Sequence, residues 1–205
     1  MPTVLRTHLT ALRMLLVLTV ILGVAYPLLV TGIGQLALAD KANGSIVRSD
    51  GKEVGSSLLG QNYNLPKQDP NNADEQARPD PKFFQPRPSA GGYDPKASGA
   101  SNLGPNDEKL TQAVNDRRAA VAAFDGVDPA SVPADALTAS GSGLDPHISV
   151  AYAKEQVARV AKERGLSTDT LKQLIAKHTD SRSLGFLGQP GVNVVTLNQA
   201  VAALK

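Results

Sequence analysis

The longest apolar segment of the chain lies near its beginning. No charged residue occurs from Met14 to Ala39, a run of 26 positions. As a helix this run is about 39 Å long at ~1.5 Å per residue, whereas the hydrocarbon core of a bilayer is ~30 Å thick. Core helices of soluble proteins seldom stay uncharged for so long, so the pattern predicts a transmembrane helix over residues 14–39.

A cleaved signal peptide is the second interpretation of this segment. Ala37, Leu38 and Ala39 have the small–x–small form of a signal-peptidase site. The apolar run exceeds the ~7–15 residues of a usual signal, which favours an uncleaved anchor. On these residues alone both interpretations stay open.

The charges that flank the apolar run predict its orientation. Arg6 and Arg13 are the only charged residues before Asp40. The positive-inside rule then predicts that residues 1–13 are cytoplasmic and that residues 40–205 lie outside the cytoplasm. Without these two arginines the chain is formally neutral, so it lacks the basic excess that binding to nucleic acid requires.

One face of the predicted helix is built from small residues. Gly23, Pro27, Thr31 and Gly34 fall within an arc of about 80° at ~100° per residue. Small residues allow two helices to approach closely in lipid. We therefore predict that this face contacts the helix of another membrane protein; ordinary use of such residues in membrane helices is the alternative.

The pattern after residue 40 changes to short elements. "SIVRS", between Asn43-Gly44 and Asp50-Gly51, predicts a strand between tight turns. Amphipathic helices are predicted after Asn106 to Asp125, over residues 148–164, and from a cap at Ser167 to His178. "GVNVV" predicts a strand and "TLNQAVAAL" a last helix, so the expected fold class is α+β, with helices packed on a small sheet.

A proline-rich stretch covers residues 66–106. It also contains Phe83, Phe84 and Tyr93, and flexible linkers seldom carry so many aromatic residues. We expect a long ordered loop that is pinned to the core or to a partner, with residues 67–82 as its mobile part.

"TASGSGLDPHIS", residues 138–149, holds residue types used by hydrolases. A catalytic set of Ser142, Asp145 and His147 is disfavoured because the G-x-S-x-G elbow is missing. Asp145 followed by Pro146 fits a helix start, with Ser149 as a competing cap. Ser140, Gly141, Ser142 and Gly143 are weak candidates for holding an anion with backbone amides.

Metal and thiol chemistry find little support in the composition. The chain has no Cys and three scattered His, which excludes disulfides and thiolate sites and disfavours a histidine metal cluster.

Several long motifs in consistent order resemble one known family. They are "YPLLVTGI", "FFQPRPSA", "SGASNLGPND", "TASGSGLDPHIS", "ARVAKERGL" and "GFLGQPGVNVVTLNQAV". Together they cover nearly the whole chain and resemble the C subunit of the bacterial Kdp potassium-transporting P-type ATPase. The longer polar insertion around residues 67–82 departs from that pattern. The resemblance implies an uncleaved anchor in the bacterial inner membrane.

The resemblance also implies partners and a role. The partners are a channel-like potassium-translocating subunit, a P-type ATPase catalytic subunit and a small single-helix subunit. The role is to assemble or stabilise the complex without independent catalysis or a cofactor of its own. Residues expected at the contacts are Phe83, Phe84, Arg87, Tyr93, Asn102, Asp145 and His147.

Two expectations about mechanism conflict. The family's C subunit has been proposed to act as a catalytic chaperone that raises the affinity of the catalytic subunit for ATP, which it would share. ATP is cytoplasmic, however, while the positive-inside rule places residues 40–205 outside. An extracytoplasmic cap over the potassium entrance is the alternative, and a hydrolase that uses Ser142 and His147 is a remote one.

Overall fold

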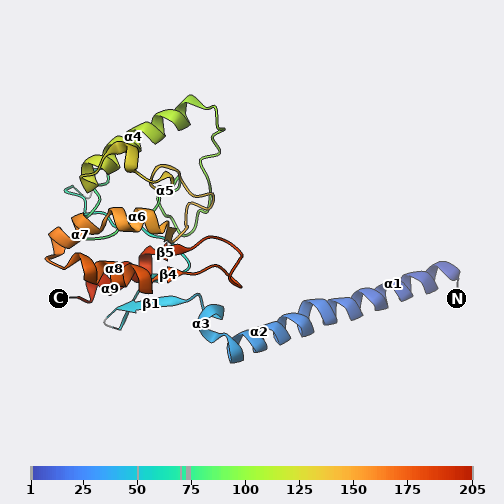
Figure 1. Ribbon diagram of the computed structural model, residues 1–205. Helices are drawn as coiled ribbons and strands as arrows, with labels where there is room; N and C mark the ends of the chain where they lie inside the picture. Colours follow the sequence, from blue (N-terminus) through green and yellow to red (C-terminus); the bar gives the residue numbers. More distant parts are fainter. Residues whose placement is uncertain (1, 50, 70, 73–74, 205) are drawn as a thin grey trace. The chain divides into compact units, whose positions relative to one another are not determined.

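The computed structural model describes residues 2–49, 51–69, 71–72 and 75–204. The chain divides into two compact units, Met1–Ile46 and Val47–Lys205, and each is described by itself (Figure 1).

The first unit is helical. It consists of α1 (Thr3–Val20), a π-helical turn (Ile21–Ala25), α2 (Tyr26–Ala37) and the short α3 (Ala39–Ala42). The stretch Thr3–Ala37 has 35 residues and no buried described residue, and it contains an 18-residue segment with a mean hydropathy of 2.4. Its length and composition suffice to cross a membrane. The predicted apolar helix is therefore present, and it begins at Thr3 because Arg6 and Arg13 also have good helix propensity.

The π-helical turn changes the predicted small-residue face. Pro27 has no N–H to offer to the carbonyl of Gly23, and just before it the Tyr26 N–H bonds to Ile21 O, five residues back. A π-turn holds more residues than an α-turn, so Gly23 is displaced from the even 100° spacing that predicted the face. Pro27, Thr31 and Gly34 lie together in the regular helix α2.

The second unit combines helices with two small sheets. β1 (Ile46–Ser49) and β2 (Lys52–Ser56) form a two-stranded sheet. β3 (His147–Ile148), β5 (Gly191–Asn193) and β4 (Thr179–Asp180) form an antiparallel sheet with β5 in the centre. The helices are α4 (Glu108–Asp125), α5 (Ala134–Leu137), α6 (Val150–Glu155), α7 (Val157–Arg164), α8 (Thr168–Lys177) and α9 (Val194–Ala202), with a 3₁₀ turn at Pro129–Ser131.

The α+β prediction is confirmed, and most helix ends follow their capping residues. Asp107 caps α4, which ends at Gly126 with φ 70°, and Ser167 caps α8. The predicted strand at residues 45–49 is β1, although Asp50 of its second turn lies outside the described residues.

The single helix predicted over residues 148–164 is wrong. His147 and Ile148 pair with β5 instead, and the helix begins only after its cap Ser149. It is then interrupted at Gln156 between α6 and α7. The amphipathic pattern could not show this interruption, because residues on both sides of Gln156 face the same core.

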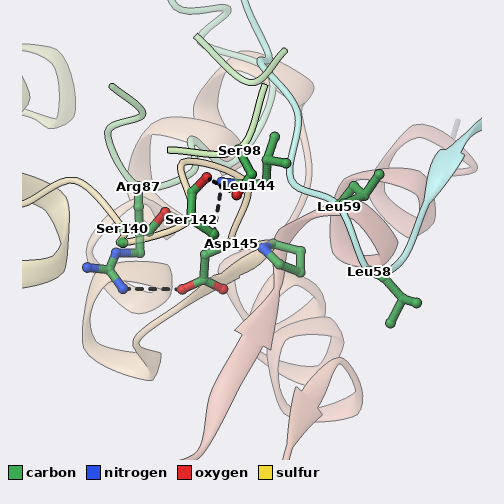
Figure 2. A pocket seen from close by; sticks show the side chains of 10 residues that line it. Leu58, Leu59, Arg87, Ser98, Ser140, Ser142, Leu144 and Asp145 are labelled. Carbon is green, nitrogen blue, oxygen red and sulfur yellow. Dashed lines mark hydrogen bonds and ion pairs between the residues drawn. The ribbon is translucent and has the colours of Figure 1, made fainter. Parts of the chain in front are cut away.

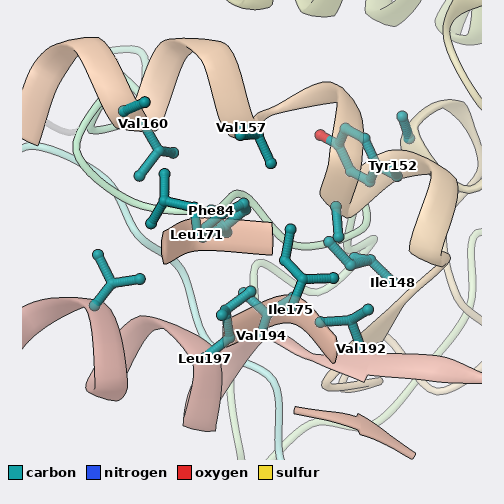
Figure 3. Close-up of a cluster of buried hydrophobic side chains, with 14 of the residues drawn as sticks. Phe84, Ile148, Tyr152, Val157, Val160, Leu171, Ile175, Val192, Val194 and Leu197 are labelled. Carbon is teal, nitrogen blue, oxygen red and sulfur yellow. The ribbon is translucent and has the colours of Figure 1, made fainter. Parts of the chain in front are cut away.

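The core of the second unit lies between α6, α7, α8, α9 and β5 (Figure 3). Its fully buried side chains include Val160, Leu171, Ile175, Val192 and Leu197. Phe84 reaches this centre from the proline-rich loop and is 0% exposed. The loop is thus pinned to the core, as one of the two sequence-based alternatives expected.

Two buried carboxamides hold the backbone around Phe84. The Phe84 N–H donates to Asn198 Oδ1 at 2.8 Å, and Asn198 Nδ2 donates to Phe84 O at 2.8 Å. Gln156 pairs with the next residue in the same way: the Gln85 N–H donates to Gln156 Oε1 at 2.6 Å, and Gln156 Nε2 donates to Gln85 O at 3.1 Å. We call this arrangement the carboxamide clamp; it pairs an extended segment as a neighbouring strand would.

A buried arginine extends the clamp to α4. Arg159 Nε donates to Asp125 Oδ1 at 2.6 Å, and its Nη1 donates to the carbonyls of Pro81 and Phe83. Burial raises the pKa of Asp125, and the hydrogen bond and charge of Arg159 oppose that rise. One guanidinium therefore ties α7 to the loop and to the last turn of α4.

Residues 67–82 close on themselves at their base. Asn64 and Pro79 form a bridge, and Glu75 accepts from the N–H groups of Gln68 and Asp69 at 2.8 and 3.0 Å. These two backbone hydrogen bonds lower the pKa of Glu75. The predicted mobility of this segment stays a prediction, and residues 70, 73 and 74 lie outside the described residues.

The carboxamide clamp can be tested by shape-matched substitution. Asn198→Leu keeps the number and branching of the side-chain heavy atoms but leaves the buried N–H and C=O of Phe84 without partners. We expect the free energy of unfolding to fall by about 2–4 kcal/mol, from unpaired buried polar groups at ~1–3 kcal/mol each. Urea denaturation of the full chain in detergent, followed by circular dichroism, measures this. Gln173→Leu on the exposed side of α8 is the control, and an equal loss there would contradict the assignment.

Candidate functional site

The segment 138–149 folds as a turn followed by the cap of α6. Ser149 is the N-cap: its Oγ accepts from Tyr152 N–H at 3.0 Å, and Asp135 holds its N–H and Oγ at 2.6 and 2.8 Å. The alternative of Asp145 as N-cap is wrong, because its carboxylate accepts from His147 N–H in a turn that leads into β3.

A chain of charged side chains crosses this segment. Arg87 Nη1 lies 3.2 Å from Asp145 Oδ2, and Asp145 Oδ1 lies 3.5 Å from His147 Nδ1. His147 Nε2 then donates to Asp180 Oδ2 at 2.8 Å. We call these four residues the charge relay chain of the domain; it links the proline-rich loop to β3 and, beyond the central strand, to β4.

A glycine in the central strand makes the last link of this chain possible. Gly191 pairs with Asp180, and a Cβ on Gly191 would lie 3.2 Å from His147 Cβ and 3.4 Å from its Cδ2. The imidazole therefore lies on the bare backbone of β5. A side chain at residue 191 would push the ring away from Asp180.

The surroundings shift both titrating groups toward their charged forms. The hydrogen bond to Asp145 raises the pKa of His147; burial opposes this rise, and Asp180 adds to it. Burial alone would raise the pKa of Asp145, but the hydrogen bonds from His147 and the charge of Arg87 outweigh it and lower the pKa. When His147 is protonated, the four groups form two ion pairs, Arg87 with Asp145 and His147 with Asp180.

The pair of Arg87 and Asp145 lies between two hollows. One, of about 440 Å³, is lined by the turn 140–142 and by Leu58, Leu59 and Ser98 (Figure 2). The other, of about 370 Å³, is lined by His147, Asp135, Gln189 and Pro190. Two buried atoms beside the first hollow, Arg87 Nε and Ser140 Oγ, have no hydrogen-bond partner within the described part of the chain.

The turn itself is already occupied by backbone contacts. Ser140 N–H donates to Pro88 O and Gly143 N–H donates to Ser140 O. The carbonyl of Ser142 accepts from Gly99 N–H at 2.9 Å and from Ser98 Oγ at 3.0 Å. Two of the four amides predicted to bind an anion are therefore used within the domain, which weakens the candidate site at Ser140, Gly141, Ser142 and Gly143.

The structure does not assemble a hydrolytic triad. Ser142 Oγ accepts from Leu144 N–H at 3.1 Å, as Figure 2 shows, and is not hydrogen-bonded to His147 among the described residues. His147 is engaged by Asp145 and Asp180 instead. The hydrolase alternative thus has no nucleophile beside its base.

Comparisons with known proteins settle the family. The family model for the K⁺-transporting ATPase c chain matches residues 8–203. The chain is 52% identical to the potassium-transporting ATPase KdpC subunit of Kineococcus radiotolerans, over 98% of this chain and 95% of the relative. KdpC subunits of Streptomyces coelicolor and Mycobacterium tuberculosis are 47% and 48% identical, over 97% of this chain and 93% and 99% of their own lengths.

The chain belongs to the KdpC family. The sequence-based resemblance is confirmed, and with it the place of the chain as an accessory subunit of a potassium-transporting ATPase complex. The polar insertion around residues 67–82 falls within the matched region.

Two predicted interface residues of this KdpC-family chain are core residues. Phe84 is fully buried, and Tyr93 is buried with its hydroxyl donating to Arg87 O at 2.7 Å. Both side chains are used in packing within the domain, so their contact with a partner stays a prediction that this burial does not favour. Phe83 is half-buried against Tyr63, with ring centres 5.6 Å apart, whereas Asn102 is exposed.

The sequence analysis missed Asp180 of the charge relay chain and Gly191, on which the ring of His147 lies. Asp180 lies 33 residues from His147 and shares no local motif with it. The pairing of β3 and β4 on opposite edges of β5 brings the two together. The signal that was available is the strand prediction at "GVNVV", and a single strand does not reveal its neighbours.

The raised pKa of His147 predicts a stability that depends on pH. Stability gained from protonated His147 is fully present below the usual pKa of 6.5 and is lost as pH rises through the higher pKa of the folded state. We expect the free energy of unfolding of the wild type to exceed that of His147→Gln by several tenths of a kcal/mol at about pH 6, because such partly exposed pairs contribute ~0.2–1 kcal/mol. At about pH 9 the difference should be smaller.

Unfolding titrations at both pH values measure this difference. His8→Gln, at an exposed position of α1, is the control for the loss of an imidazole. A difference that grows with pH would show that His147 is neutral in the folded domain.

Proposed function

We propose that this chain is a non-catalytic, single-pass subunit of an ATP-driven potassium importer in the bacterial inner membrane. Its apolar helix packs on a partner helix, and its folded domain docks outside the cytoplasm on the potassium-translocating subunit, as a cap at the potassium entrance. The observation that carries the proposal is the helix Thr3–Ala37, whose described residues have no cover from the rest of the chain.

The orientation of the domain rests on charge. Arg6 and Arg13 precede the apolar run, and the chain after it is formally neutral. The positive-inside rule therefore supports a cytoplasmic segment of residues 1–13 and an extracytoplasmic domain of residues 40–205. The potassium-translocating subunit, the catalytic subunit and a small single-helix subunit are the partners that we propose, on the basis of family membership.

A direct role of this subunit in ATP binding has weaker support than the proposed cap. The turn 140–143 uses two of its amides within the domain, and Arg87 beside it is paired with Asp145. The proposed orientation also separates the domain from cytoplasmic ATP. We propose that the subunit has no cofactor of its own and that any effect on ATP use passes through assembly of the complex.

The helix contact is tested by adding bulk to the part of the small-residue face that lies in α2. Thr31→Leu combined with Gly34→Leu should abolish co-purification of the subunit with the complex, because close helix approach in lipid requires small side chains. The matched control is Ala25→Leu with Gly32→Leu, which adds similar bulk elsewhere on the helix. Equal recovery of the complex with both pairs would show that this face makes no essential contact.

The orientation is tested by protease access. Lys67 and Lys82 are exposed and lie in the loop 67–82, so trypsin added outside spheroplasts should cut there. The same loop should be protected in inverted membrane vesicles, because the bilayer then separates it from the enzyme. Immunoblotting of the fragments measures both. Cleavage only in inverted vesicles would place the domain in the cytoplasm and refute the cap.

A further inference from the structure

The turn between β4 and β5 carries an exposed apolar cluster. Ser183 and Leu187 form a bridge with both backbone hydrogen bonds at 2.9 Å, so the turn is ordered. Gly185 and Gly188 adopt φ values of 82° and 80°, which close it. We call residues 182–190 the apolar tip.

Three large apolar side chains point outward at this tip. Leu184 is 83% exposed, Phe186 67% and Leu187 50%. Leu58, at 59%, is the most exposed large apolar residue elsewhere among the described residues of the second unit, so Leu184 and Phe186 exceed it. A cluster of three such residues on a formed turn is unusual for a soluble surface. They therefore suggest a surface that is covered when the protein is in place.

The charges near the apolar tip indicate what kind of partner covers it. No charged residue occurs from Ser183 to Leu204, and Arg182 stands at the base of the tip. Asp180, the nearest acid before it, is engaged by His147. An aromatic residue and two leucines beyond a single arginine match the boundary of a bilayer, where apolar groups enter the acyl region and arginine meets phosphates.

The tether between the apolar helix and the second unit is short. Only residues 38–46 separate the two, and Ala39–Ala42 are helical. Even fully extended, these residues span about 30 Å at ~3.3 Å each. A helix inserted in a bilayer therefore holds the start of the second unit close to that bilayer.

We propose that the apolar tip inserts Leu184, Phe186 and Leu187 into the boundary between headgroups and acyl chains of the bilayer that holds the apolar helix. Arg182 meets lipid phosphate. The domain then has two attachments to the membrane, its covalent tether and this tip, which limits its rotation above the surface. The inference rests on the proposed insertion of the helix and adds a lipid contact to the proposed docking on protein.

The absence of tryptophan from the chain offers a clean probe. Phe186→Trp places a single indole in the tip, and the full chain is reconstituted in nanodiscs of phosphatidylcholine and phosphatidylglycerol. Brominated acyl chains should quench this indole at least about two-fold and its emission should be blue-shifted, as for interfacial aromatic residues. Adding Leu184→Ser and Leu187→Ser should remove most of the quenching.

Ala119→Trp on the exposed side of α4 is the control. Its co-elution with nanodiscs reports insertion of the helix, independently of the tip. If this control chain co-elutes while the indole of the Phe186→Trp variant is quenched no more than that of the control, the lipid contact is wrong and the anchor stands. Shielding of the tip indole that occurs only when the other subunits are added would also overturn the proposal, because the tip would then bind protein.

Discussion

The fold of the second unit depends on the carboxamide clamp. Phe84 is the largest fully buried side chain of the domain, yet it comes from a loop without helix or strand of its own. Burying the backbone of Phe84 alone would leave its N–H and C=O without hydrogen-bond partners. The free-energy cost would be comparable to the gain from burying the phenyl ring. Gln156 and Asn198 remove this cost because each carboxamide supplies both an acceptor and a donor to one residue.

The clamp explains the position of the candidate site. Arg87 follows Gln85 by two residues, so fixing the backbone of Phe84 and Gln85 also places Arg87 beside Asp145. The hydroxyl of Tyr93 then returns to the carbonyl of Arg87. The core therefore positions the charge relay chain, and the strength of its ion pairs depends on the packing around Phe84.

The sequence predicted what depends on local chemistry. The apolar helix, the start of α4 after Asn106, the cap at Ser167 and the ordered aromatic loop follow from composition and spacing within a few residues. The pairings of Asn198 with Phe84 and of His147 with Asp180 join residues 114 and 33 positions apart. No local pattern specifies such contacts. The sequence analysis therefore predicted Gln156 as an ordinary helix residue and Phe84 as a residue that contacts a partner.

Phe84 and Asn198, which pair in the carboxamide clamp, lie 114 residues apart, and this separation sets the order in which the domain can fold. The proline-rich loop emerges long before α9 exists, and its aromatic side chains have no final place until the last helix is complete. Closure of such distant contacts is slow, because the entropy of the intervening chain is lost before the contact stabilises it. The domain consequently closes its core only after α9 has been synthesised, and a chain that lacks α9 keeps an unsealed interior.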